Sequence, residues 1–138
     1  MSPTASGNGL HVLVAEDDLE IADMLRTTLA GAGYDVTLVH DGEEALRAAL
    51  AQRPDLVVLD VMMPQMNGWE VCKALRARRE MAGVGILMLT AIGPNLNEMT
   101  APLYGADDHL DKPFVITELL ARLAALAEKV AAERSATA

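Results

Sequence analysis

The chain has 138 residues, 51% of them apolar, which fits one domain with a substantial core and excludes a chain that is a disordered tail as a whole. Twenty acidic and eleven basic residues give a net charge of −9, which argues against nucleic acid and anionic membranes as partners. The single Cys72 excludes an internal disulfide, and no apolar run has the length of a membrane span. Because the first nine residues also lack the pattern of a signal peptide, we expect a cytoplasmic domain.

Five short strands are predicted along the chain. Unbroken apolar runs are typical of parallel strands that are covered on both faces, and they occupy residues 12–14, 56–59 and 86–89. The alternation of polar and apolar residues at 35–38 predicts an edge strand, and a shorter run around 109–110 predicts a second one. We therefore expect a sheet with three central strands and two edge strands.

Amphipathic helices are predicted between these strands. Apolar residues recur every three or four positions in four stretches, at residues 21–29, 46–50, 71–75 and 116–130. Asp18 is the predicted N-cap of the first helix, and Gly31 marks its end. A further helix at 94–104 has a weaker pattern, because Pro94 and Pro102 disfavour a helix interior.

The pattern of a strand followed by a helix is thus repeated five times. Right-handed crossovers convert this pattern into a doubly wound α/β fold, with a five-stranded parallel sheet and five helices. We expect a flexible leader over residues 1–9, one domain over 10–127, and a helical extension or tail over 128–138. Ligands bind beyond the carboxyl ends of the strands in such sheets. The polar residues that follow each apolar run are therefore the candidate site.

Charged and hydroxyl side chains follow four of the predicted strands. They are Glu16 and Asp17 after the first strand, Asp60 at the end of the third, Thr90 at the end of the fourth and Lys112 after the fifth. Carboxylates about 4 Å apart repel one another by roughly 4 kcal/mol at an effective dielectric constant of 20, so the cluster requires a cation. Hard oxygen ligands favour Mg²⁺, with Mn²⁺ as a substitute. A carboxylate beside a metal, an ammonium and a hydroxyl is arranged to attack phosphorus.

Four separated motifs carry a resemblance to one protein family. They cover residues 15–18 (AEDD), 59–68 (LDVMMPQMNG), 89–91 (LTA) and 111–114 (DKPF). In this order and spacing they resemble the receiver domain of response regulators, which is CheY-like, over roughly residues 10–127. The stretch 105–110 (GADDHL) is similar to the OmpR/PhoB type of receiver. The resemblance implies a flavodoxin-like strand order of 2-1-3-4-5 and a role in two-component signalling.

The resemblance also implies a phosphoacceptor and a metal site. Asp60 would accept a phosphoryl group from a phosphohistidine of a sensor histidine kinase or a phosphotransfer protein. Asp17, Asp60 and the backbone carbonyl of Met62 would bind Mg²⁺ directly, and Glu16 would act through water. The bond between Lys112 and Pro113 is expected to be cis, as in the family.

Further residues are expected to hold the phosphoryl oxygens and to respond to them. Lys112 and Thr90 would bind these oxygens, together with the backbone N–H groups of Met62 and Ala91. Thr90 and His109 would form the switch. His109 occupies the switch position of the family, which more often holds Tyr or Phe but also accepts His. Phosphorylation would then change the surface of the fourth helix, fifth strand and fifth helix.

This surface is the expected contact with an output domain, a downstream protein or a second copy of the chain. OmpR/PhoB-type receivers dimerise there through ion pairs, and Asp108, Glu118 and Arg122 match three of the participating positions. Glu98 stands where a basic residue is usual, and Pro102 interrupts the expected fourth helix. The surface therefore serves either a homodimer or another partner.

Three other functions compete with phosphotransfer signalling. An aspartate-nucleophile phosphatase usually carries a second Asp two residues after the nucleophile, but Met62 occupies that position. A dinucleotide-binding enzyme needs a Gly-rich turn after the first strand, where this chain has acidic residues. A receiver that binds partners without phosphorylation is disfavoured by the complete acidic cluster. The prediction is thus a signalling domain that acts on no substrate besides its own phosphoryl group, either stand-alone or part of a transcriptional regulator.

Apolar residues flank the expected approach of water to the phosphoryl group. They are Met62, two residues after Asp60, and Ile92, two residues after Thr90. Neither side chain orients a water molecule through a hydrogen bond. We therefore expect slow self-dephosphorylation.

Overall fold

The computed structural model describes residues 9–63, 65–90 and 105–137, with side chains up to residue 134. Five parallel strands form one sheet in the order β2-β1-β3-β4-β5, which confirms the expected doubly wound fold. All neighbouring strands pair in parallel. The strands are β1 (His11–Ala15), β2 (Asp35–Val39), β3 (Leu56–Asp60), β4 (Gly85–Thr90) and β5 (Asp108–Asp111).

Four α-helices and one short 3₁₀ helix lie within the described residues. They are α1 (Leu19–Gly31), α2 (Gly42–Gln52), α3 (Gly68–Arg76), the 3₁₀ helix η1 (Arg79–Met81) and α5 (Ile116–Thr137). The helix expected at 94–104 lies outside the described residues. Asp18 caps α1 as predicted, because its carboxylate accepts hydrogen bonds from the backbone N–H groups of Glu20 and Ile21.

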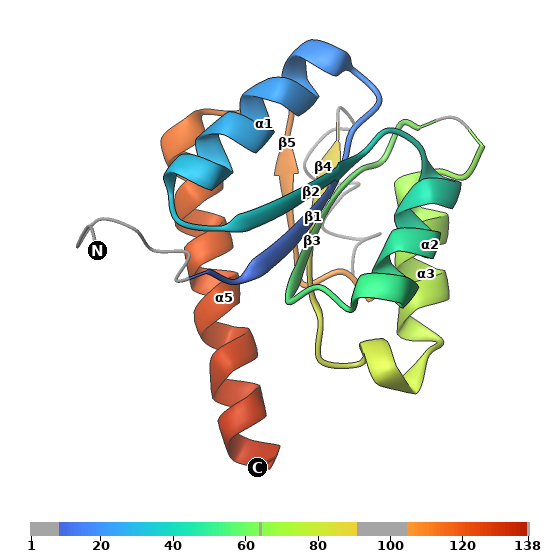
Figure 1. Ribbon diagram of the computed structural model, residues 1–138, viewed down its shortest axis with the longest axis vertical. Helices are drawn as coiled ribbons and strands as arrows, with labels where there is room; N and C mark the ends of the chain where they lie inside the picture. Colours follow the sequence, from blue (N-terminus) through green and yellow to red (C-terminus); the bar gives the residue numbers. More distant parts are fainter. Residues whose placement is uncertain (1–8, 64, 91–104, 138) are drawn as a thin grey trace.

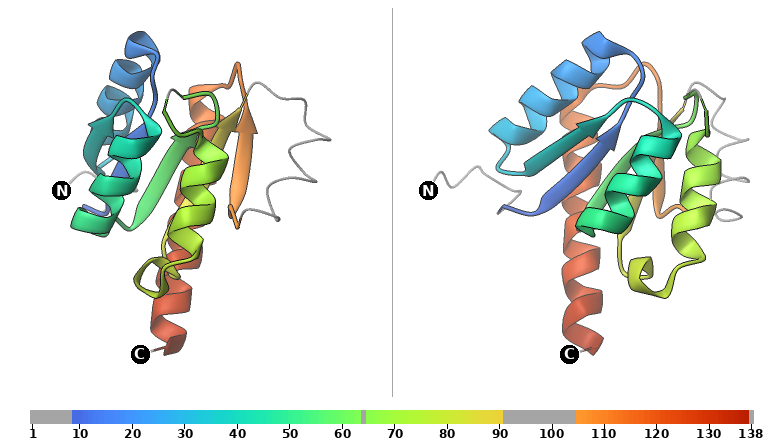
Figure 2. Two further views of the ribbon diagram at one scale, coloured as in Figure 1. Left: turned by 90° about the vertical axis from the view of Figure 1, so that its right-hand side faces the viewer. Right: turned by 45° about the vertical axis from the view of Figure 1, so that its right-hand side comes forward.

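The two faces of the sheet carry separate apolar cores. Val57 and Ile86 belong to the core under α2 and α3, whereas Val58 and Leu87 belong to the core under α1 and α5. Successive residues of a strand point to opposite faces, so a strand that is covered on both sides needs an unbroken apolar run. Figures 1 and 2 show the resulting three layers, with the sheet between the two helix pairs.

The C-terminal half of helix α5 packs against the beginning of β4. Leu126 and Val130 are buried there against Gly85, where an added Cβ would lie 2.8 Å from Leu126 Cγ. Lys129 Nζ lies 2.9 Å from Asp107 Oδ1. The expected boundary after residue 127 therefore falls inside a continuous helix. Among the helices of the described part of the chain, neither α5 nor any other is both long and apolar enough to span a bilayer.

A second ion pair connects the last turns of α5 to the sheet. Arg134 Nη1 lies 2.6 Å from Asp55 Oδ1, and the other oxygen of Asp55 accepts a 2.8 Å hydrogen bond from the N–H of His11. Asp55 directly precedes β3, and His11 is the first residue of β1. The carboxylate therefore joins α5 to the beginning of two central strands.

Candidate functional site

Three carboxylates meet at the carboxyl end of the sheet. Glu16 and Asp17 directly follow β1, and Asp60 is the last residue of β3. One carboxylate oxygen from each residue lies within 4.8 Å of the others. Glu16 and Asp60 are 0% and 2% exposed, whereas Asp17 is open to solvent. The structure therefore gathers three of the predicted metal ligands into one site with a solvent-facing side.

The strand register brings the hydroxyl and ammonium groups to the same edge. Asp60 pairs with Leu89, so Thr90 lies one residue beyond it on the neighbouring strand. Thr90 is buried, and its carbonyl accepts a 2.7 Å hydrogen bond from the N–H of Lys112. The bond between Lys112 and Pro113 is cis, as expected.

Lys112 contacts both buried carboxylates. Its Nζ lies 2.9 Å from Oε1 of Glu16 and 3.3 Å from Oδ1 of Asp60. The sequence predicted Lys112 as a ligand of phosphoryl oxygens but did not predict its pairing with Glu16. An ammonium in this position balances part of the buried negative charge.

The buried charges shift the pKa values of the site. Burial raises the pKa of Asp60 from 3.8 to about 7, helped by the hydrogen bond and charge of Glu16 and opposed by Lys112. Burial alone would lower the pKa of Lys112, but its hydrogen bond to Glu16 and the charge of Asp60 outweigh this effect and raise it. The ammonium of Lys112 is thus fixed in its charged form, whereas the charge of Asp60 is costly until a cation compensates it.

The carboxylate cluster fits a divalent cation. Three carboxylates surround the site and Lys112 supplies one positive charge, so a net negative charge remains. Carboxylate oxygens are ligands preferred by hard cations such as Mg²⁺ and Mn²⁺. Glu16, Asp17 and Asp60 are therefore the residues that could hold such a cation.

Backbone groups of Met62 and Gly68 lie close to Asp60. The N–H of Met62 donates a 3.2 Å hydrogen bond to Oδ1 of Asp60, so this amide already faces the carboxylate. The N–H of Gly68 donates to the carbonyl of Val61 at 3.0 Å. A Cβ at Gly68 would lie 2.5 Å from the carbonyl oxygen of Asp60, so this close approach requires glycine. Ala91, the other expected amide donor, lies outside the described residues.

His109 lies on β5 next to the site. It is half-buried and pairs in register with Met88 of β4. With Phe114, Val115 and Arg122, it lines a surface cavity of about 340 Å³. His109 and Thr90 therefore lie on neighbouring strands. The switch that the sequence predicts for these two residues stays a prediction.

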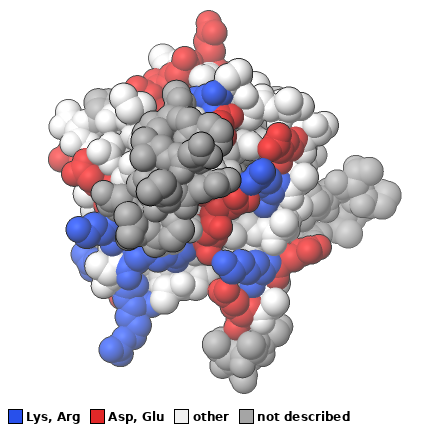
Figure 3. Space-filling view, turned by 180° about the vertical axis from the view of Figure 1, so that it is seen from behind, with Lys and Arg blue, Asp and Glu red and all other residues white. Residues whose placement is uncertain are grey.

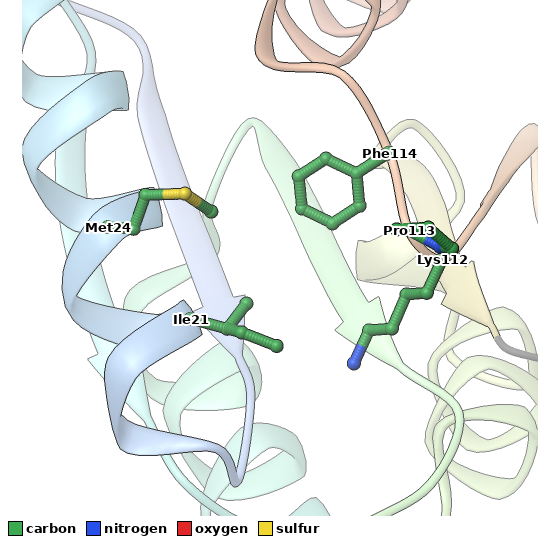
Figure 4. Close-up of a pocket in the computed structure, with 5 residues that line it drawn as sticks. All are labelled: Ile21, Met24, Lys112, Pro113 and Phe114. Atoms are coloured by element: carbon green, nitrogen blue, oxygen red, sulfur yellow. The ribbon is translucent and has the colours of Figure 1, made fainter.

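An apolar pocket adjoins the ammonium of Lys112. Ile21 and Met24 of α1 face Phe114 and Pro113 across a cavity of about 340 Å³ (Figure 4). The sequence analysis did not identify this pocket. The sequence did carry a signal for this pocket, because Met24 lies beside the apolar stripe that packs into the core. In the structure Met24 is 37% exposed.

The comparison with known families identifies this arrangement. Residues 12–124 match the family described as the response regulator receiver domain. The chain belongs to the receiver domain family of response regulators. A receiver domain is the signal-accepting part of a two-component response regulator, in agreement with the resemblance found in the four sequence motifs.

Curated relatives include several response regulators from mycobacteria. The chain is 45% identical over 128 residues to response regulator MprA of Mycobacterium avium (strain 104), which covers 92% of the chain and 55% of the relative. The same protein of Mycobacterium tuberculosis (strain ATCC 25618 / H37Rv) is also 45% identical over 128 residues, covering 92% and 54%. The chain therefore spans about half the length of the curated relatives it matches.

Solved structures of receiver domains share the fold. A putative response regulator from Chloroflexus aurantiacus J-10-fl is 36% identical, with a TM-score of 0.82 over 87% of this chain and 98% of that one. The receiver domain of a sensor histidine kinase from Pseudomonas aeruginosa PAO1 is 32% identical, with a TM-score of 0.80 over 87% and 98%. That structure holds a magnesium ion in its active site cleft. The acidic site of this receiver domain therefore has a magnesium-binding counterpart in the family.

Proposed function

We propose that this receiver domain accepts a phosphoryl group on Asp60. A carboxylate oxygen of Asp60 would attack the phosphorus of a phosphohistidine, forming a P–O bond while the P–N bond to the imidazole breaks. The imidazole leaves with the bonding electron pair and takes up a proton. The observation that carries this proposal is the position of Asp60, which ends a central strand beside Lys112 and two further carboxylates. The domain acts on no substrate besides its own phosphoryl group.

A divalent cation is the proposed partner of the acidic residues. Asp17, Asp60 and the carbonyl of Met62 would hold Mg²⁺ directly, with Glu16 acting through water and Mn²⁺ as a substitute. The cluster of carboxylate oxygens supports this assignment. When bound, the cation supplies positive charge that compensates the carboxylates and the phosphoryl oxygens.

The proposed contacts to the phosphoryl oxygens come from three chain segments. Lys112 would contribute its ammonium, Thr90 its hydroxyl, and Met62 and Ala91 their backbone N–H groups. The short contacts of Lys112 and of the Met62 N–H to Asp60 support two of these roles. Such donors act most strongly in a site that is sheltered from water.

The phosphodonor in this proposal is a sensor histidine kinase or a phosphotransfer protein. An apolar pocket formed by Ile21, Met24 and Phe114 borders Lys112, so an apolar side chain of the donor would dock there while its phosphohistidine reaches Asp60. We infer a cytoplasmic location, where such kinases present their phosphohistidine.

The phosphoacceptor assignment has a direct test. Incubation with acetyl phosphate and Mg²⁺ should produce a shifted band on a phosphate-affinity gel, and Asp60→Asn should remove the shift. Asp35→Asn, which removes an exposed carboxylate of β2, is the matched control and should keep it. Full labelling of the Asp60 variant would contradict the assignment. In Asp17→Asn, labelling should lose its dependence on Mg²⁺.

The output surface would comprise the expected helix at 94–104, β5 and α5. Phosphorylation adds a charge of about −1.5 to −2 near Thr90, and Thr90 and His109 would transmit the change to this surface. Arg122 already pairs within the chain, at 2.9 Å to Asp108 and 3.3 Å to Glu118. Figure 3 shows the face opposite to that of Figure 1, where Lys and Arg side chains lie beside Asp and Glu side chains.

A homodimer is the first partner to test on this surface, because Arg122 and Asp108 could exchange partners between two copies. Light scattering with and without beryllofluoride should show an increase in mass with the activator, and Arg122→Ala should remove it. A constant mass would favour an output domain or another downstream protein as the partner. The receiver domain would then be part of a longer regulator or act through a separate protein.

A further inference from the structure

Met62 exposes its thioether at the entrance of the phosphoacceptor site. The residue is 66% exposed, the largest value among the methionines whose side chains the structure describes. Met24 follows at 37%, and the neighbouring Met63 is 9% exposed. Oxidation of methionine follows exposure, so Met62 is the most vulnerable of these sulfur atoms.

The backbone holds Met62 beside Asp60. Its N–H donates a hydrogen bond to Oδ1 of Asp60 at 3.2 Å. Its side chain lines a surface cleft of about 560 Å³ together with Asp17, Met63 and Asn67. A group attached to Asp60 would therefore lie close to Met62 and to the cleft that Met62 lines.

We infer that oxidation of Met62 to its sulfoxide is a modification that shortens the lifetime of the phosphoryl group on Asp60. The inference rests on the proposed function, because it concerns the same phosphoryl group. The oxidant is a peroxide, such as hydrogen peroxide. The reaction converts an apolar group at the entrance of the site into a strong hydrogen-bond acceptor.

The peroxide supplies the oxygen atom for this step and accepts the two electrons that the sulfur loses. A lone pair of the Met62 sulfur attacks one peroxide oxygen, the O–O bond breaks and an S=O bond forms. The sulfur loses two electrons and the peroxide is reduced, so that one water molecule leaves. Methionine sulfoxide reductases reverse the change, which makes it suitable for regulation.

The sulfoxide oxygen changes how water approaches the phosphorus. Hydrolysis forms a bond from a water oxygen to phosphorus and breaks the bond to the Asp60 carboxylate, releasing inorganic phosphate and a proton. The thioether of Met62 is a weak hydrogen-bond acceptor and does not orient an attacking water, whereas a sulfoxide oxygen at this position would accept a hydrogen bond from it. One such hydrogen bond corresponds to a rate increase of roughly fivefold.

The chain offers matched variants for the test. Met62→Gln carries an amide oxygen at the position of the sulfoxide oxygen, and Met62→Leu keeps the apolar volume without the sulfur. Met24→Leu removes the next most exposed of the described thioethers, on α1. Each purified chain is treated with dilute hydrogen peroxide, quenched with catalase, and phosphorylated with acetyl phosphate and Mg²⁺. After removal of the donor, the decay of the aspartyl phosphate is followed on phosphate-affinity gels.

Peroxide should accelerate the decay about fivefold in the original chain and in Met24→Leu, but not in Met62→Leu. Untreated Met62→Gln should decay as fast as the oxidised chain. Tandem mass spectrometry should localise the added oxygen to Met62 before Met63. An unchanged decay despite oxidation of Met62, or equal acceleration in Met62→Leu, would overturn the inference alone. Failure of the untreated chain to take up phosphate would instead overturn the proposed function, and the inference with it.

Discussion

The ammonium of Lys112 donates a 2.9 Å hydrogen bond to Glu16, although the two residues lie 96 positions apart in the chain. Glu16 directly follows β1 and Lys112 directly follows β5, so the parallel sheet brings both to one edge. A buried carboxylate without a partner is strongly destabilising, so Lys112 stabilises the folded site as well as serving its proposed role toward phosphate.

Replacement of Lys112 tests this stabilising role. In the absence of divalent cations at pH 8, Lys112→Met should lower the free energy of unfolding by about 1–3 kcal/mol, because Glu16 and Asp60 lose their shared cation. Mg²⁺ should restore part of the loss. Urea denaturation measures the change. Lys129→Met is the control, since its ion pair with Asp107 is half exposed and should contribute less than about 1 kcal/mol. Equal losses in the two variants would contradict the stabilising role.

The raised pKa of Asp60 predicts a pH-dependent effect of its neutralisation. Between pH 4 and about 7 the folded domain keeps a proton on Asp60 that the unfolded chain has lost, so the stability contributed by this group falls as the pH rises. Asp60→Asn imitates the protonated form. Without divalent cations it should therefore raise the free energy of unfolding by about 1–3 kcal/mol at pH 8 and have little effect near pH 4.

Urea denaturation of Asp60→Asn and the original chain at both pH values gives the comparison. Asp35→Asn, at an exposed position of β2, should show no such difference between the two pH values. If Asp60→Asn raised the free energy of unfolding equally at pH 4 and pH 8, the charge of Asp60 would not be the cause of the stabilisation.

The length of α5 predicts that the folded domain extends beyond residue 127. Truncation after Ala127 removes buried Val130 together with the ion pairs of Lys129 and Arg134. The truncated chain should lose roughly 2–4 kcal/mol of unfolding free energy, mostly through the apolar contact. Thermal unfolding measures the loss. Truncation after Arg134 is the control and should cost much less, and equal stability of the two truncated chains would support a boundary at 127.

The apolar residues Met62 and Ile92, which follow Asp60 and Thr90 by two positions in the sequence, predict a long-lived phosphoryl group. After removal of the phosphodonor, the chain should keep its phosphate in Mg²⁺ for much longer than seconds, because the apolar side chain of Met62, two residues after Asp60, does not orient water. The double variant Met62→Asn, Ile92→Glu should lose phosphate roughly ten- to a hundredfold faster. Decay within seconds in the original chain, or no acceleration in the variant, would show that these side chains do not control hydrolysis.

The sequence predicted which polar residues the sheet brings to one edge, because these residues follow recognisable strands. An unbroken apolar run gives the end of β3 at Asp60 and the end of β4 at Thr90, and parallel strands bring such ends together. The pairing of Lys112 with Glu16 was not predicted, because side-chain partners across 96 positions leave no local pattern.

The sequence predicted the helical pattern of α5 as far as Val130 but not the contacts of its last turns. The stretch after residue 127 consists largely of alanine and charged residues, which support a helix without showing a second apolar face. The contact of Val130 with Gly85 and the ion pair of Arg134 with Asp55 depend on the position of α5 across the sheet. Such tertiary contacts lie outside what residue spacing reveals.

The unbroken course of α5 has a consequence for any polypeptide joined to it. Over its 22 residues the helix rises about 33 Å, and each residue turns the chain by about 100°. The buried side chains of Leu126 and Val130, together with the ion pair of Arg134 with Asp55, set the rotation of this helix relative to the sheet. A module fused in helical continuity after Thr137 would therefore have a defined rotation about the helix axis. Insertion of two residues would turn that module by about 200°, whereas insertion of seven would return it to within about 20° of its first orientation.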